Sequence, residues 1–144
     1  MIQFWKLRRE LARLGQQLRA IPETLWKPAA QRKHDRAFDA GFPVHDGAQP
    51  LGKKIAILLI YQPHGIQESI LEICTHLLAQ GFIPFILTNT PLSPHDLERL
   101  IPRVWRIIER PNFGYDFGGY RDGIKALWQW KITPGSLLVL NDSI

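Results

Sequence analysis

The residues best suited to bind a ligand lie in one stretch, residues 110–123, which reads R-P-N-F-G-Y-D-F-G-G-Y-R-D-G. The stretch follows an apolar run, Val104 to Ile108, and precedes a helical pattern that begins near Tyr120. Its glycines permit positive φ and close backbone approach to a ligand, and a helix start offers unpaired N–H groups to an anion. The spacing is neither G-x-G-x-x-G nor that of a phosphate loop. A tight strand-to-helix turn capped by Asp116 is the alternative interpretation.

A second group of candidate ligands, Asn141-Asp142-Ser143, follows directly on the apolar run from Leu137 to Leu140. A carboxylate that comes immediately after a buried strand suits a hard cation or a hydroxyl ligand. The same three residues also suit the cap of a following helix. Both interpretations of this group remain open.

Apolar runs and helical patterns alternate along the part of the chain that must position these groups. Strands are expected at 55–61, 82–87, 104–108 and 136–140, and helices at 67–80, 94–101 and 119–130. Gly81 marks the end of the first helix, and Ser93-Pro94 marks the start of the second as an N-cap followed by proline. In the third helix, Ile124, Leu127 and Trp128 are expected to face the core because of their i, i+3, i+4 spacing.

The order β-α-β-α-β-α-β predicts an α/β fold, a Rossmann-like parallel sheet of about four strands with helices on both faces. All strands of such a sheet end at one edge, where ligands bind. The segments that leave the strands at this edge are Tyr61-Gln62-Pro63-His64, Thr88-Asn89-Thr90, Arg110 to Gly119, and Asn141-Asp142-Ser143. The sequence therefore predicts a polar binding rim built from four separate segments.

Two segments precede this domain. Residues 1–25 carry a stripe of apolar residues at helical spacing, with arginines on the remaining surface, and predict a basic amphipathic helix that ends near Pro22. The apolar stripe, from Phe4 to Leu25, has three interpretations: docking on protein, contact with an anionic membrane, or nucleic-acid binding. Residues 26–53 mix proline, glycine and charge without a period and predict an irregular linker.

Composition narrows the class of protein. With 144 residues the chain has room for one domain with a real core. Residues 1–52 hold nine basic and five acidic side chains, whereas residues 53–144 hold nine and eight, so a nucleic-acid surface on the domain is not expected. No apolar run approaches the ~20 residues of a membrane span, and no signal peptide is expected. A single cysteine, Cys74, fits a reducing cytosol and predicts a cytoplasmic location.

The two polar motifs together resemble the rhamnan synthesis protein F family, which consists of glycosyltransferases of bacterial cell-surface polysaccharide assembly. The motifs are R-P-N-F-G-Y-D-F-G-G-Y-R-D-G-I at 110–124 and L-L-V-L-N-D-S-I at 137–144. The resemblance covers about residues 54–144 and extends to nucleotide-sugar glycosyltransferases of GT-A fold. It implies a nucleoside-diphosphate sugar as donor, Mg²⁺ or Mn²⁺ on the diphosphate, and a lipid-linked or polysaccharide acceptor at the cytoplasmic face of the membrane.

The resemblance also implies roles for individual residues. The strand ends at Tyr61 and Asn89 match nucleotide-contacting positions, and Asn112 begins the turn that lines the donor site. The implied donor-binding residues are Tyr61, Gln62, Asn89, Asn112, Gly114, Asp116, Arg121, Asn141 and Ser143, and the implied metal ligand is Asp142.

The chain departs from the pattern of that superfamily in two ways. The usual acidic motif has two carboxylates, whereas here Asp142 stands between Asn141 and Ser143. The half of a GT-A domain that carries the acceptor site and general base is not recognisable, so residues 54–144 resemble the donor-binding half of an incomplete domain. We therefore expect no turnover by the isolated chain. The alternative is a non-catalytic α/β interaction module whose N-terminal helix binds a membrane or a partner.

Overall fold

The computed structural model describes residues 26–142 of the chain. The chain divides into two compact units, residues 1–41 and residues 42–144. In the first unit, residues 26–40 form a helix in which Gln31 donates a hydrogen bond to Asp35 one turn later. The prediction of an irregular linker over 26–53 is therefore wrong for residues 26–40. Alanine, glutamine, lysine and arginine are good helix formers, and they favour a helix even where the apolar residues show no helical period. The expected amphipathic helix over 1–25 lies outside the described residues.

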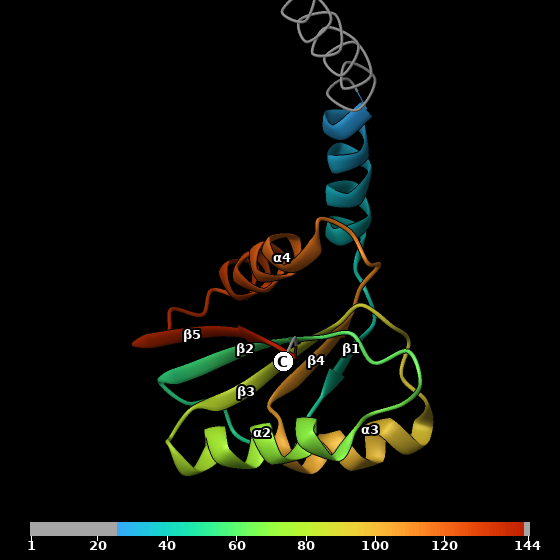
Figure 1. Ribbon diagram of the computed structural model, residues 1–144. Helices are drawn as coiled ribbons and strands as arrows, with labels where there is room; N and C mark the ends of the chain where they lie inside the picture. Colours follow the sequence, from blue (N-terminus) through green and yellow to red (C-terminus); the bar gives the residue numbers. More distant parts are fainter. Residues whose placement is uncertain (1–25, 143–144) are drawn as a thin grey trace, which may run out of the picture. The chain divides into compact units, whose positions relative to one another are not determined.

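The second unit is an α/β fold, as predicted, built on a five-stranded sheet (Figure 1). Its strands are β1 (Val44–Asp46), β2 (Lys54–Ile60), β3 (Ile83–Thr88), β4 (Arg106–Glu109) and β5 (Ser136–Asn141). Its helices are α2 (Glu68–Ala79), α3 (Pro94–Leu100), a 3₁₀ turn (Ile101–Arg103) and α4 (Tyr115–Gln129). The sequence did not predict β1. This strand lies within residues 26–53, which were expected to form a linker, and it pairs antiparallel with β4.

The strands lie in the order β1-β4-β3-β2-β5, and β2 to β5 are all parallel. Numbered along the chain, the four parallel strands have the order 3-2-1-4, which is the order found in nucleotide-binding doubly wound sheets. The direction of winding reverses between β2 and β5. Helices α2 and α3 consequently cover one face and α4 covers the other (Figure 1). A ligand crevice is expected at the carboxyl ends of β2 and β5, where the winding reverses.

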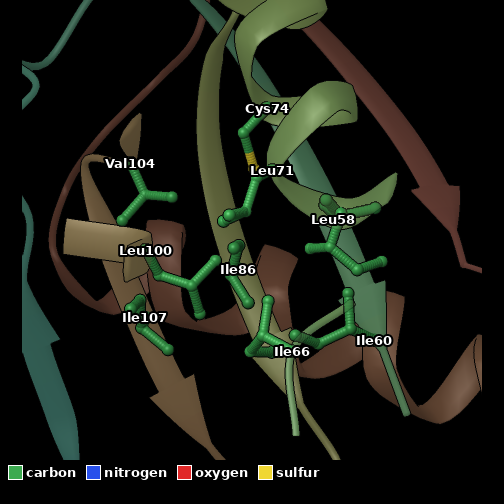
Figure 2. Packing of buried hydrophobic residues seen from close by; sticks show 10 residues of the cluster. Leu58, Ile60, Ile66, Leu71, Cys74, Ile86, Leu100, Val104 and Ile107 are labelled. Carbon is green, nitrogen blue, oxygen red and sulfur yellow. The ribbon is translucent and has the colours of Figure 1, made fainter. Parts of the chain in front are cut away.

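One core lies between the sheet and the helices α2 and α3 (Figure 2). Leu58 and Ile60 of β2 alternate with residues that point to the other face, as the period of a strand requires. Cys74 of α2 packs in this core. The predicted end of α2 at Gly81, with φ of 77°, and the predicted start of α3 at Ser93 are both confirmed.

The opposite face of the sheet is covered by α4 through small residues. A Cβ atom on Gly119 would lie 2.5 Å from a methyl group of Leu59, and one on Gly123 would lie 3.0 Å from a methyl group of Ile57. The helix therefore approaches β2 closely along its glycine face. The prediction that Ile124 and Trp128 face the core is wrong for this reason: both are exposed, and only Leu127 of that triplet is buried.

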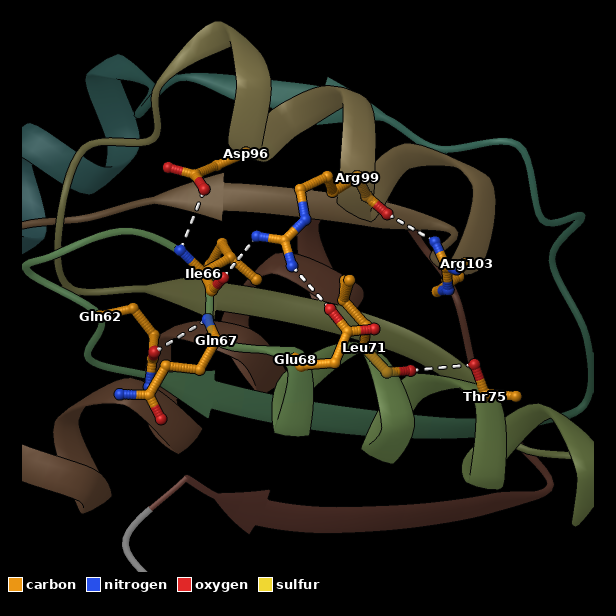
Figure 3. A network of polar contacts seen from close by, with 9 residues as sticks. All are labelled: Gln62, Ile66, Gln67, Glu68, Leu71, Thr75, Asp96, Arg99 and Arg103. Carbon is orange, nitrogen blue, oxygen red and sulfur yellow. Dashed lines mark hydrogen bonds and ion pairs between the residues drawn. The ribbon is translucent and has the colours of Figure 1, made fainter.

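The segment that follows β2 is held against α3 by a polar network (Figure 3). The carboxylate of Asp96 accepts a hydrogen bond from the backbone N–H of Ile66 at 3.0 Å and another from the hydroxyl of Ser93 at 2.7 Å. Arg99 donates to the carbonyl oxygen of Ile66 and to Glu68. The backbone at Ile66 is thus fixed in place, and the next N–H along the chain, that of Gln67, donates to the side-chain oxygen of Gln62 at 3.3 Å.

Candidate functional site

The carboxylate of Asp142 lies at the point where β2 and β5 end side by side. Its Oδ2 atom accepts a hydrogen bond from the backbone N–H of Tyr61 at 2.9 Å and from the side-chain amide of Gln62 at 2.7 Å. The backbone N–H of Asp142 donates to the carbonyl oxygen of Leu59 at 3.1 Å, so the sheet pairing continues up to this residue. The three predicted site residues Tyr61, Gln62 and Asp142 therefore meet where the winding of the sheet reverses.

The glycine-rich stretch reaches the same place through Asp116. The side-chain amide of Asn141 donates to the carboxylate of Asp116 at 2.6 Å, which joins the first turn of α4 to the end of β5. Asp116 is thus not the helix cap of the alternative interpretation. The N-cap position belongs to Gly114, with φ of 74°, and the residue after it, Tyr115, also has a positive φ of 52°. Two consecutive left-handed residues, one of them a tyrosine, mark a strained turn at this edge of the sheet.

The centre of this turn is Arg110, which the sequence did not single out. Its guanidinium is fully buried and pairs with the buried carboxylate of Asp122 at 2.7 Å. It also donates to the side-chain oxygen of Asn89 at the end of β3 and to the carbonyl oxygen of Phe113. One arginine thereby fixes the ends of two strands, the loop 111–114 and the inner face of α4. The predicted ligand residue Asn89 uses its carbonyl oxygen in this arrangement.

A signal for the Arg110–Asp122 pair was present in the sequence. Asp122 lies on the same helical face as Gly119, Gly123 and Ala126, and that face is buried. A carboxylate on a face of small, core-facing residues needs a buried cation, because an unpaired charge there is costly. Arg110, at the end of the preceding strand, is the basic residue placed to meet it.

Three predicted site residues lie apart from the others. Asn112 lies in an exposed loop, and Arg121 lies beside Ile124, Lys125 and Trp128 on the outside of α4. Asn89 is bound by Arg110 at the end of β3. The predicted site residue Ser143 lies outside the described residues. The residues that the structure does bring together at the ends of β2 and β5 are Tyr61, Gln62, Asp116, Asn141 and Asp142, with Gly114 at the start of the adjoining helix.

The carboxylates at the ends of β2 and β5 do not form a metal cage. Within residues 26–142, no three His, Cys, Asp or Glu side chains are close enough together to hold an ion among them. Asp116 accepts a hydrogen bond from Asn141, and the hydrogen bonds from Tyr61 and Gln62 to Asp142 both use its Oδ2 and not its Oδ1. A single carboxylate suits Mg²⁺ or Mn²⁺ only where phosphate oxygens and water complete the coordination, which is common for Mg²⁺ on nucleotides.

The pKa values of Cys74 and Tyr120 are both raised by their surroundings. Burial raises the pKa of the Cys74 thiol to about 12, although the positive charge of Arg103 opposes this effect. The thiol therefore stays protonated at neutral pH and is unsuited to act as a nucleophile. In α4, burial and then the charge of Asp116 raise the pKa of Tyr120 above its usual value, so its hydroxyl stays protonated at neutral pH.

Comparison with known proteins gives one relative and no family. The chain is 44% identical over all of its 144 residues to the uncharacterized protein y4gN of Sinorhizobium fredii. The match spans 38% of that protein, so the chain corresponds to little more than a third of its relative. No family model and no solved structure matches the chain. Among the described residues, none of the helices has both the length and the apolar composition needed to cross a membrane.

Proposed function

We propose that this chain binds a nucleoside-diphosphate sugar in the crevice between the ends of β2 and β5. It would do so as the donor-binding part of a glycosyltransferase-like protein of cell-surface polysaccharide biosynthesis. One observation carries the proposal: polar side chains from the two motifs converge where a sheet of the order 3-2-1-4 reverses its winding. That is the position at which sheets of this order bind nucleotides.

Each part of the crevice has a chemical role in such binding. The first turn of α4 starts at this edge, and its unpaired N–H groups and helix dipole favour the diphosphate. The exposed ring of Tyr61 offers a surface for a base, and the amides of Gln62 and Asn141 offer donors and acceptors for hydroxyl groups. A divalent cation held by Asp142 and the diphosphate would neutralise charge on the leaving group.

Chemistry on an acceptor needs more than this crevice. A general base for the acceptor hydroxyl is not identified among the described residues, and the chain spans about a third of its relative. We therefore expect the isolated chain to bind the donor without transferring the sugar. The acceptor class that fits the proposal is a lipid-linked or growing polysaccharide at the cytoplasmic face of the membrane.

Isothermal titration with UDP- and dTDP-sugars, with and without Mn²⁺, tests the proposal. We expect Mn²⁺ to strengthen binding, and Asp142→Asn to remove about tenfold or more of the affinity measured with Mn²⁺ while keeping a hydrogen-bond acceptor for Tyr61. The matched control is Asp46→Asn, because Asp46 is an exposed carboxylate paired with Arg106 at the opposite edge of the sheet.

Circular dichroism must show that both variants are folded. Failure of every nucleotide sugar to bind the folded parent chain would contradict the proposal and favour the scaffold alternative. Equal losses in Asp142→Asn and Asp46→Asn would show that net charge matters, and not the crevice.

A further inference from the structure

Helix α4 carries a second apolar surface on the side that faces away from the sheet. Phe117, Ile124 and Trp128 are 86, 48 and 77% exposed, and they recur at i, i+7 and i+11, which places them on one stripe of the helix. The buried stripe of the same helix, with Gly119, Gly123 and Ala126, lies opposite. We call the exposed stripe, together with Arg121 and Lys125, the outer face of α4.

The charged residues of α4 are divided between its two faces. Arg121 and Lys125 lie on the outer face and, with Ile124 and Trp128, line a shallow hollow there. Arg121 keeps a distant contact, 3.6 Å, with Asp122. The two acidic residues of the helix are turned elsewhere: Asp116 binds Asn141, and Asp122 is buried against Arg110. The outer face therefore combines large apolar side chains with cations and has no carboxylate of its own helix.

This combination is not needed for the α/β fold, because α4 already covers the sheet with its glycine face. Large apolar side chains exposed at 48 to 86% are costly in water unless a partner covers them. Tryptophan and phenylalanine beside lysine and arginine are typical of helices that lie in the interface of an anionic bilayer. In protein interfaces, by contrast, lysine is depleted.

We propose that the outer face of α4 docks on a membrane that contains anionic phospholipids. The rings of Phe117 and Trp128 enter the headgroup region, and Arg121 and Lys125 contact lipid phosphates while their aliphatic stems stay in the apolar layer. The helix then lies parallel to the bilayer plane. Because α4 begins at the edge of the crevice, docking brings the crevice to the level of the lipid headgroups. This surface is separate from the apolar stripe of residues 4–25, and its docking does not require a nucleotide sugar.

Cosedimentation of the full chain with vesicles tests the proposal. The probes are vesicles of phosphatidylglycerol mixed with phosphatidylcholine and vesicles of phosphatidylcholine alone. We expect binding to the anionic vesicles, at least about tenfold weaker binding to the neutral ones, and loss of binding at high salt. Trp128→Glu and the double variant Arg121→Glu/Lys125→Glu should each weaken binding to anionic vesicles by about tenfold, whereas Trp128→Phe should retain most of it.

A matched pair of variants controls for nonspecific effects. Ile124 and Leu51 are both 48% exposed, but Leu51 lies in the loop before β2. Ile124→Glu should weaken vesicle binding severalfold, and Leu51→Glu, with the same change of charge, should leave it within about twofold, provided that circular dichroism shows both variants folded.

Four results would overturn the proposal. They are absence of binding to anionic vesicles, equal binding to neutral ones, equal effects of Ile124→Glu and Leu51→Glu, and binding that survives Trp128→Glu. The last result would assign membrane contact to another segment, such as residues 4–25. Self-association of the parent chain that Trp128→Glu abolishes, in the absence of vesicle binding, would assign the outer face to a contact between copies.

Discussion

The strands β2 and β5 lie side by side with nearly the same apolar composition, yet their surroundings differ. In β2, every residue from Ile55 to Ile60 is at most 2% exposed, whereas Leu137, Leu138 and Val139 of β5 are 38 to 42% exposed. The difference comes from neighbours. β2 has a strand on each side and helices above and below, but β5 is paired only with β2 within the described residues.

Continuous apolar composition on both faces of a parallel strand is typical of an internal position in a sheet. β5 has that composition without the burial, and an apolar strand edge of this kind is a surface where other chains can pair. An apolar run in the sequence therefore predicts a strand, but the burial of that strand depends on which other segments of the protein pack against it. Stability should accordingly be concentrated around β2 to β4.

The largest expected effect comes from the buried ion pair at the end of β4. Arg110→Met leaves Asp122 buried without its cation and should lower the free energy of unfolding by about 3–5 kcal/mol. Adding Asp122→Leu removes the stranded charge and should recover a large part of that loss. Urea unfolding followed by circular dichroism measures both variants. A double variant no more stable than Arg110→Met would show that the pair acts through its shape and not its charge.

The comparison of the two strands is tested directly by truncating one leucine in each. Leu58→Ala empties a fully buried position and should cost about 2–5 kcal/mol. Leu138 lies on the same side of the sheet as Leu58, but its side chain is already 38% exposed. Leu138→Ala should therefore lower the free energy of unfolding by only about 1 kcal/mol. Similar losses in urea unfolding would mean that β5 is covered in solution, for example by a second copy of the chain.

The smallest expected effect depends on pH. Hydrogen bonds from the Ile66 N–H and then from the Ser93 hydroxyl lower the pKa of Asp96 below its ordinary value of 3.8. Because the folded pKa is below the unfolded one, ionised Asp96 stabilises the fold above that value, and the contribution is lost as the pH falls through the folded pKa. Asp96→Asn should therefore cost about 1 kcal/mol at neutral pH. The difference from the parent chain should shrink as the pH falls below 3.8, and a difference that stays the same down to the acid-unfolding transition would contradict the assignment.

The elements of the sheet could be predicted because each carries a local signal. The apolar runs gave β2 to β5, Gly81 and Ser93 gave the ends of helices, and the parallel order placed Tyr61, Asn89 and Asp142 at one edge. The short strand β1 could not be predicted, since its three residues have no period and are ordered by pairing with β4. The helix over 26–40 was not predicted because its charged residues and isolated aromatics show no apolar period. Many of its residues are nevertheless good helix formers.

The orientation of α4 and the role of Arg110 needed tertiary information. The triplet Ile124, Leu127 and Trp128 resembled a core stripe, but steric clearance decided the buried face, since only glycine at positions 119 and 123 lets the helix reach β2. The topology rule predicted that Tyr61, Gln62 and Asp142 would lie at one edge of the sheet, and they meet there. Which side chains meet there depended on distances that no spacing in the sequence encodes.

The hydrogen bond from the backbone N–H of Tyr61 to the carboxylate of Asp142 also has a consequence for synthesis of the protein. The two residues are 81 positions apart, and β2 receives its second neighbouring strand only when β5 is made. At a translation rate of about 5–20 residues per second, roughly 4–16 s pass between the synthesis of Tyr61 and that of Asp142. During this time one edge of β2 has no partner strand. During that interval the nascent chain displays an open, fully apolar strand edge, a good binding surface for a chaperone. The hydrogen bonds from Tyr61 and Gln62 to Asp142 therefore form only after β5 has been made.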